Sequence, residues 1–177
     1  MLKECATAET FRRATVDQLR PLVDVLAGLE WPCPVSQIPI IIERLGWVYV
    51  RDLVAVETDT LLPINRTMGE IYYSDGYITR LGFPVSDYVS KSDPLALKTV
   101  SDAFPMGICD VESILGPQSH EDVDLDGIAW DLDSGGRIRL DNIGIGLHAW
   151  LLSQDLADAE RFEETHDISE FYDDEDE

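Results

Sequence analysis

Cysteine is scarce in this sequence, and its spacing is irregular. The 177 residues include 3 cysteines, Cys5, Cys33 and Cys109, an odd number that suits neither a disulfide framework nor a zinc knuckle. Reduced thiols are typical of cytoplasmic proteins, so we expect a cytoplasmic protein without disulfide bonds.

Long apolar runs are also missing. Residues 1–7 lack the apolar stretch of a secretory signal, and no segment approaches the about 20 apolar residues that span a membrane. The apolar fraction of 45% is nevertheless ordinary for a globular protein and suffices for a core. We predict a single α+β domain over residues 1–165, followed by an acidic tail, residues 166–177, whose composition predicts disorder.

Basic residues are few compared with acidic ones. The chain has 13 lysines and arginines against 35 aspartates and glutamates, a formal net charge of -22 at pH 7. Residues 155–177 hold 12 of the acidic residues and one of the basic residues, which leaves 23 acidic and 12 basic residues, a net charge of -11, on the rest. Such a field repels nucleic acids and anionic membranes and attracts basic surfaces. We therefore expect a basic protein partner, and neither a nucleic acid nor a membrane.

Helix signals occur near the start, in the middle and near the end of the chain. A capping-box pattern at Thr15 and Gln18 precedes leucines and valines at helical spacing, and an Asp93-Pro94 pair is typical of a helix start. The predicted helices cover residues 15–30, 36–45, 93–104, 109–115 and 153–165.

Strand signals come in consecutive groups between these helices. Alternating apolar residues predict strands over residues 47–56, 70–73, 77–81, 128–132, 137–140 and 146–152. Turn residues at 74–76 and 134–136 predict two hairpins. Because the strands follow one another instead of alternating with single helices, we predict an α+β fold with antiparallel pairing. Two hairpin or meander segments would form one sheet or two, packed with N-terminal, central and C-terminal helices.

One segment resembles the start of an EF-hand calcium loop. Asp122, Asp124, Asp126 and Gly127 have the required spacing, because alternate carboxylates followed by a glycine turn can surround a hard cation. The last ligand position holds Asp133 instead of glutamate, and the intervening residues alternate as they do in a strand. An acidic strand edge is therefore the better interpretation, and we expect neither a metal ion nor a cofactor.

The sequence also lacks a recognisable catalytic motif. Of its three histidines, His120 and His166 lie in polar segments, and His148 lies among apolar neighbours, where a structural role is ordinary. No glycine-rich phosphate loop follows a predicted strand. We therefore expect a binding protein and not an enzyme.

Tyrosines and carboxylates cluster at the two predicted hairpins. Tyrosine beside acidic residues is a common composition of surfaces that bind arginine and lysine, although each tyrosine can instead be a core or sheet-face residue. The four tryptophans lie in periodic apolar segments and are predicted to be core residues. The candidate partner-binding residues are Tyr72, Tyr73, Asp75 and Tyr77 at the first hairpin, and Asp131 and Asp133 at the second.

The layout of the chain resembles an actinobacterial family of immunity proteins. The resemblance rests on Leu-Glu-Trp-Pro at residues 29–32, Glu-Arg-Leu-Gly-Trp at 43–47, and residues 130–137 running into Ile-Gly-Ile-Gly-Leu-His at 143–148. In size the chain is similar to the immunity factor for tuberculosis necrotizing toxin. This resemblance, over most of residues 15–165, implies a 1:1 complex that blocks a secreted NAD-hydrolysing toxin by occluding its active site. Its motifs are packing and turn signatures, so it assigns no inhibitory residue.

Three functions remain open from the sequence. The leading hypothesis is an immunity protein whose acidic side chains meet the basic active-site cleft of a cognate toxin. The second is an acidic secretion chaperone or adaptor that keeps a basic substrate soluble. The third is a calcium-responsive protein, and a nuclease inhibitor that mimics nucleic acid is a variant of the first.

Overall fold

The structure is a computed structural model, and it describes residues 4–122 and 127–165. The predicted tail, residues 166–177, lies outside the described residues, as do Asp124 and Asp126 of the calcium-loop pattern. The helices are α1 (Val16–Ala27), α2 (Ile38–Leu45), α3 (Pro94–Leu115) and α4 (Gln154–Thr165), with a 3-10 turn at Val35–Gln37 before α2. The strands are β1 (Val48–Asp52), β2 (Val56–Asp59), β3 (Met68–Ser74), β4 (Tyr77–Pro84), β5 (His120–Asp122), β6 (Gly127–Asp131), β7 (Arg137–Asn142) and β8 (Leu147–Leu152).

All these strands belong to one antiparallel sheet in the order β1-β2-β3-β4-β8-β7-β6-β5. Each half of the sheet is a meander, β1–β4 and β5–β8, and the pairing of β4 with β8 joins the two, for example at Phe83 and Ala149. The α+β fold with antiparallel pairing is thus confirmed, and the sequence's open choice is settled in favour of one sheet.

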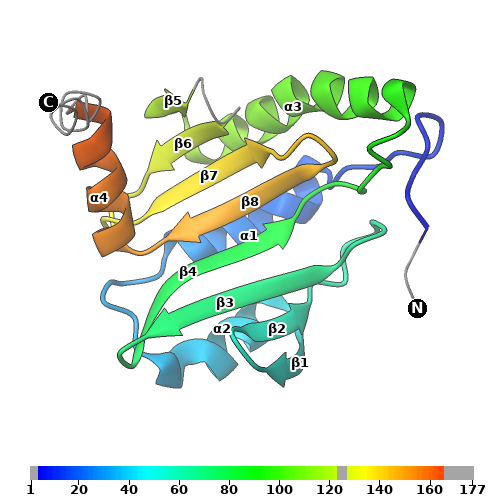
Figure 1. Ribbon diagram of the computed structural model, residues 1–177. Helices are drawn as coiled ribbons and strands as arrows, with labels where there is room; N and C mark the ends of the chain where they lie inside the picture. The colour runs from blue at the N-terminus through cyan, green and yellow to red at the C-terminus, as the bar shows by residue number, and fades with distance from the viewer. Residues whose placement is uncertain (1–3, 123–126, 166–177) are drawn as a thin grey trace, which may run out of the picture.

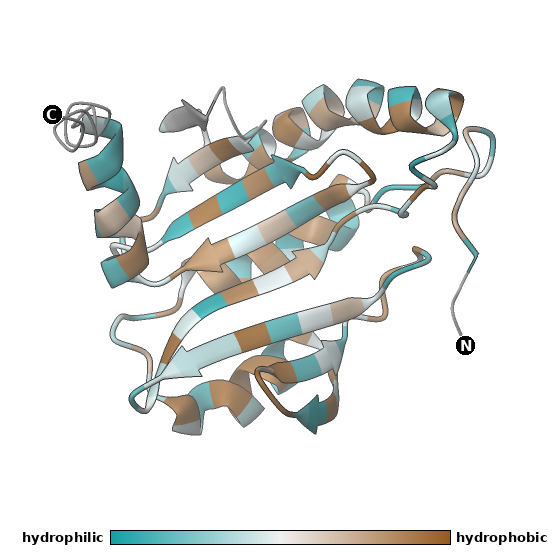
Figure 2. Ribbon diagram, in the orientation of Figure 1, coloured by the Kyte–Doolittle hydropathy of each residue, from teal (hydrophilic) through white to brown (hydrophobic). Residues whose placement is uncertain are grey.

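The core lies between one face of this sheet and the helices. Residues opposite one another on antiparallel strands share a face, and Ile71, Leu81, Leu151 and Ile138 form such a row. All four side chains are buried, as are those on the inward side of α1. Figure 1 shows α1 behind the sheet, α3 along the side of β5–β7, and α4 at the end where β8 stops. Along the strands, apolar residues alternate with polar ones (Figure 2), so the second face is more polar.

Sequence patterns of a few neighbouring residues predicted several helix and strand ends correctly. The Thr15 hydroxyl accepts a hydrogen bond from the Gln18 amide, and the Gln18 side chain accepts one from the Thr15 amide, which completes the predicted capping box. Asp93 caps α3 by accepting from the next two free amides, at 3.1 Å each. The turn between β3 and β4 has positive φ at Asp75 and Gly76, as the Asp-Gly pair predicted.

Three predictions of local structure were wrong. Residues 47–56 form two strands, because the chain turns at residues 53–55 and β2 returns along β1. Residues 93–104 and 109–115 form one helix, α3, which continues through Pro105 because burial of its inner face outweighs the hydrogen bond that proline cannot donate. The tryptophans also divide: Trp47 and Trp130 are core residues, but Trp31 and Trp150 are only partly buried.

Candidate functional site

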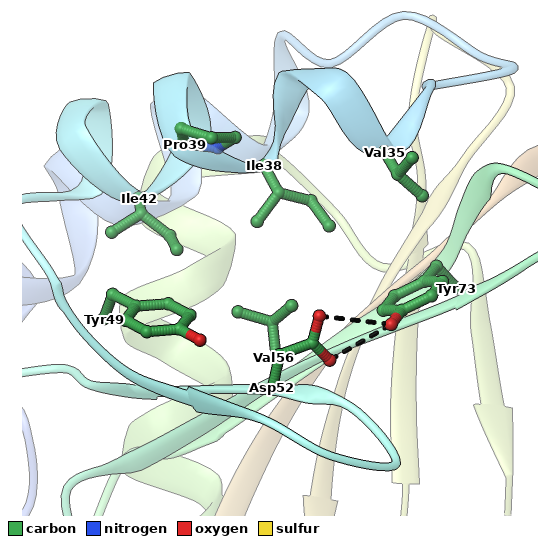
Figure 3. Close-up of a pocket in the computed structure, with 8 residues that line it drawn as sticks. All are labelled: Val35, Ile38, Pro39, Ile42, Tyr49, Asp52, Val56 and Tyr73. Atoms are coloured by element: carbon green, nitrogen blue, oxygen red, sulfur yellow. Dashed lines mark hydrogen bonds between the residues drawn. The ribbon is translucent and has the colours of Figure 1, made fainter.

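An apolar groove lies between α2 and the β1–β3 end of the sheet, and we call it the α2–β1 groove. It has a cavity volume of about 550 Å³. Figure 3 shows side chains from α2 and from the strands facing one another across it. The lining residues are Val35, Ile38, Pro39, Ile42, Tyr49, Asp52, Val56 and Tyr73.

The groove follows from how α2 and β1 are built. Helix α2 is short, begins with Pro39 in its first turn, and ends at Gly46 with φ +67°, a conformation that favours glycine. Strand β1 has a register shift between Tyr49 and Arg51. The extra residue lets Tyr49 and Asp52, three positions apart, both line the groove.

The edge strand beside the groove is apolar and exposed. All five residues of β1 are exposed, including the consecutive Val48, Tyr49 and Val50, and Val54 in the following turn is 87% exposed. Strand β1 pairs only with β2, so its other edge has no neighbouring strand among the described residues. Contiguous exposed apolar residues on an open strand edge mark an interaction site or an aggregation hazard.

One carboxylate lies at this groove. The Tyr73 hydroxyl donates to Asp52, 3.0 Å from Oδ1 and 3.2 Å from Oδ2 (Figure 3). The hydrogen bond to Asp52, and then its charge, raise the pKa of Tyr73. On the opposite face of the strand, Arg51 forms a two-point ion pair with Glu57, at 2.6 and 3.1 Å. The groove therefore offers apolar walls, two phenols and one negative charge.

The predicted tyrosine cluster of the first hairpin is divided over different surfaces. Tyr73 lies in the groove, whereas Tyr72 lies on the outer face of the sheet beneath Arg80, whose guanidinium carbon is 4.3 Å from the ring centroid. The same guanidinium stands 5.3 Å from the ring of Trp150, so two aromatic rings hold it in place.

Asp75 and Tyr77 belong to a second pocket, at the start of α4. This pocket has a cavity volume of about 560 Å³, and Trp31 and Ser153 also line it. Asp75 and Tyr77 are both exposed, as a partner-binding role requires. They do not face the α2–β1 groove, so the structure does not unite the first hairpin's four candidates in one site.

Asp131 of the second hairpin already forms ion pairs within the protein. Its carboxylate accepts hydrogen bonds from Arg137 Nε at 2.9 Å and Arg161 Nε at 3.0 Å, and so ties α4 to the sheet. Burial would raise the pKa of Asp131, but these two guanidinium groups lower it overall. Asp133 is exposed in the turn. Of the two, only Asp133 is placed to meet a partner without breaking internal ion pairs.

The histidine with apolar neighbours is buried and neutral. His148 Nδ1 lies 3.2 Å from the Tyr88 hydroxyl, and the His148 ring packs against Trp150 at a centroid distance of 4.6 Å. Burial lowers the pKa of His148 to about 4. In the described part of the chain, no group of three or more histidine, cysteine, aspartate or glutamate side chains is placed to hold a metal ion. The three cysteines are free, and only Cys33 is buried.

Sequence reasoning missed the residues that make the groove distinctive. Tyr49, Asp52 and the exposed valines were assigned to one continuous strand, so no free edge was foreseen. The turn at residues 53–55 has the sequence Leu-Val-Ala and contains none of the usual turn residues. One signal in the sequence could have indicated the exposed strand. Residues 48–50 are three consecutive apolar residues, whereas a half-buried strand alternates apolar with polar residues.

Comparisons with known proteins give a family but not a function. A family model described as a family of unknown function, DUF6301, matches residues 17–153, from α1 to the end of β8. No curated protein matches the chain significantly, and no solved structure does either. Within residues 4–122 and 127–165, no helix is both long enough and apolar enough to cross a membrane.

Proposed function

The chain belongs to the DUF6301 family, and from its geometry we propose that it is an immunity protein, which binds a cognate secreted toxin and covers the toxin's active site. In this proposal it acts in the cytoplasm as one partner of a 1:1 complex and catalyses no reaction. The toxin proposed is one that hydrolyses NAD. The resemblance in sequence suggests that substrate, and the acidic composition suggests a basic active-site cleft.

The observation that carries a protein-binding function is the exposed β1 strand beside the α2–β1 groove. Buried apolar anchors surrounded by polar groups are the usual source of affinity at protein interfaces. Here Val48 and Val50 stand on the open edge, and the groove next to them can accept a side chain of a partner. Exposed apolar surface of this kind favours aggregation, so a partner that covers it is the better explanation.

Charge supports a basic partner. The net charge of -22 attracts a positively charged cleft, and enzymes that hold phosphate-bearing substrates use arginine and lysine to do so. Such attraction raises the association rate more than it raises affinity. An immunity protein benefits from speed because it must capture the toxin before the substrate is consumed.

A secretion chaperone is the second candidate, and the same groove favours it. An open strand edge next to an apolar groove suits an extended segment of an unfolded or partly folded substrate. A chaperone would form a stable complex without inhibiting any enzyme. A nuclease inhibitor differs in another way, because its partner would hydrolyse nucleic acid and not NAD.

Co-expression with a toxin separates these functions. The partner to test is the toxin-like domain encoded next to the gene for this chain, and cellular NAD and growth are measured together. We expect the wild-type chain to restore both. The Tyr49→Asp variant, which places a charge at the groove, should fail, whereas Leu95→Asp on α3, where the side chain is 71% exposed, should succeed.

Two results would contradict the proposal. If the wild-type chain binds the domain but NAD is still consumed, the chaperone is correct. If the toxin-like domain alone degrades nucleic acid in place of NAD and the chain prevents that degradation, the nuclease inhibitor is correct.

A further inference from the structure

We infer that β1 is a strand-addition site: an extended segment of the partner pairs with its free edge, and that segment alternates apolar residues with lysine or arginine. The inference rests on the proposed function only in that a partner protein supplies the segment. It specifies which element binds and what sequence pattern it binds.

The free edge of β1 has backbone groups to offer. Outside its pairing with β2, no backbone–backbone hydrogen bond among the described residues involves Val48–Asp52. An edge strand of this kind presents N–H and C=O groups that another strand can use. The opposite edge of the sheet differs, because β5 has only three residues, His120–Asp122, whereas β1 has five.

Most devices that protect an edge strand are missing from β1. It contains no proline, and its two charged side chains are engaged with their own sheet: Arg51 with Glu57, and Asp52 with Tyr73. One protective feature is present, the bulge at Val50. Because a bulge interrupts regular pairing, the added strand pairs only over short stretches, and the groove has to supply much of the affinity.

The groove determines the apolar half of the pattern. Alternate side chains of an added strand point to the same face of the sheet as Tyr49 and Asp52. On that face Ile38, Ile42 and Val56 form apolar walls, with room for a branched or aromatic side chain. The apolar residues of the segment therefore enter the groove.

The overall charge determines the basic half. Because the apolar side chains of the alternating segment enter the groove, its other side chains point to the opposite face, away from Asp52, and the net charge of -22 favours lysine or arginine there. A second copy of this chain fits less well, because it would bring a further net charge of -22. The occupant that the observations favour is thus a basic, amphipathic strand of another protein.

The test uses the full chain and a short synthetic peptide of alternating valine and lysine with blocked ends. Binding is followed by nuclear magnetic resonance on isotope-labelled protein, together with amide hydrogen exchange. We expect shift changes around the groove and slower exchange at amides of Val48–Asp52. A peptide of the same sequence, N-methylated at every second amide so that one edge cannot pair, should bind at least about tenfold more weakly.

Two matched variants separate strand pairing from simple charge attraction. Val50→Lys adds a positive charge on the edge strand, where the side chain is 53% exposed, and Leu95→Lys adds the same charge on α3, where the side chain is 71% exposed. We expect Val50→Lys to weaken peptide binding by about tenfold and Leu95→Lys to change it by less than about twofold.

Four results would overturn the inference. In the first, the alternating peptide does not bind at millimolar concentration; in the second, the N-methylated peptide binds equally well. In the third, groove residues are protected from hydrogen exchange but the β1 amides are not. In the fourth, the chain dimerises through β1. The co-expression experiment tests the proposed function separately, because it measures inhibition of the toxin and not the mode of binding. If Val50→Lys still protects cells from the toxin, the immunity function stands and only the strand-addition mode fails.

Discussion

The Tyr73 hydroxyl donates to both carboxylate oxygens of Asp52, and this contact connects two strands that are not neighbours in the sheet. Tyr73 is in β3 and Asp52 is in the edge strand β1, with β2 between them. The contact fixes the orientation of the one carboxylate at the α2–β1 groove. It also supports the end of β1, which otherwise depends on its pairing with β2.

Replacing Tyr73 by phenylalanine tests this support. Tyr73→Phe removes the hydrogen bond and keeps the ring, so we expect a small loss in the free energy of unfolding, measured by urea denaturation. Because Asp52 raises the pKa of Tyr73, the contribution is present below the ordinary tyrosine pKa of 10.0 and is lost as the pH rises above it. The difference between wild type and variant should therefore shrink in alkaline solution.

Tyr77→Phe is the matched control for this variant. Tyr77 is about as exposed as Tyr73, and its hydroxyl has no hydrogen-bond partner in the described part of the chain. We expect Tyr77→Phe to leave stability unchanged. Equal losses for the two variants would mean that the contact with Asp52 adds nothing to the edge strand.

The features that the sequence predicted well are those set by neighbouring residues. The β3–β4 turn was predictable because Asp75 and Gly76 tolerate positive φ wherever they occur. The start of α3 was predictable because Asp93 caps the amides that immediately follow it. Such signals act over a few residues and require no knowledge of the rest of the fold.

The groove depended on contacts that are distant in sequence. Whether Tyr73 meets Asp52 depends on the turn at residues 53–55, which brings β2 back along β1, and on how α2 packs above them. Similarly, Asp131 was predicted to meet a partner because its local sequence is acidic. Its guanidinium partners, Arg137 and Arg161, are brought to it by hairpin pairing and by the docking of α4.

Arg137, the most buried cation among the described residues, provides a second prediction. Its side chain is 1% exposed and is bonded to Asp131 at 2.9 Å, to Glu160 at 3.1 Å and to Glu164. Burial alone would lower the pKa of Arg137, but hydrogen bonds to these carboxylates raise it overall. Arg137→Met leaves the carboxylates facing one another. We expect a loss of about 2–4 kcal/mol, because all three are partly exposed and water screens some of the repulsion.

A surface ion pair provides the comparison for Arg137. Lys98 and Asp102 lie one helical turn apart on α3, at 2.6 Å, with side chains 70% and 63% exposed. Lys98→Met should change the free energy of unfolding by less than about 0.5 kcal/mol. Urea denaturation measures both variants, and hydrogen exchange should show α4 loosened only in Arg137→Met. Similar losses would mean that the buried cluster does not hold α4.

Gly82 makes room for the aromatic rings on the outer face of the sheet. A Cβ at this position would lie 2.3 Å from Trp150 Cζ3 and 2.9 Å from His148 Nε2. We therefore expect Gly82→Ala to cost about 1–3 kcal/mol through overpacking. The displaced Trp150 would also release the Arg80 guanidinium, so near-ultraviolet circular dichroism should change together with stability.

Gly76→Ala separates overpacking from backbone strain. Gly76 has φ +86° and open space around the position of a Cβ, so its substitution costs about 1–2 kcal/mol by strain alone. The tryptophan signals should stay unchanged in this variant. Unchanged tryptophan signals in Gly82→Ala as well would show that the ring stack adjusts without displacement.

Burial of His148 predicts a dependence of stability on pH. Its pKa is lowered from 6.5 to about 4 in the folded protein, so between these values the unfolded chain binds a proton that the folded chain does not. The contribution of the neutral ring is fully present above pH 6.5 and is lost as the pH falls toward 4. This difference corresponds to about 3 kcal/mol. Urea denaturation at a series of pH values measures it.

Carboxylates also titrate toward the lower end of this range, so the comparison of variants carries the prediction. His148→Gln can still hydrogen-bond with the Tyr88 hydroxyl but cannot bind the proton, and its stability should fall less steeply between pH 6.5 and 4. If His148→Gln and wild type keep parallel profiles, the proton taken up on unfolding belongs to another group.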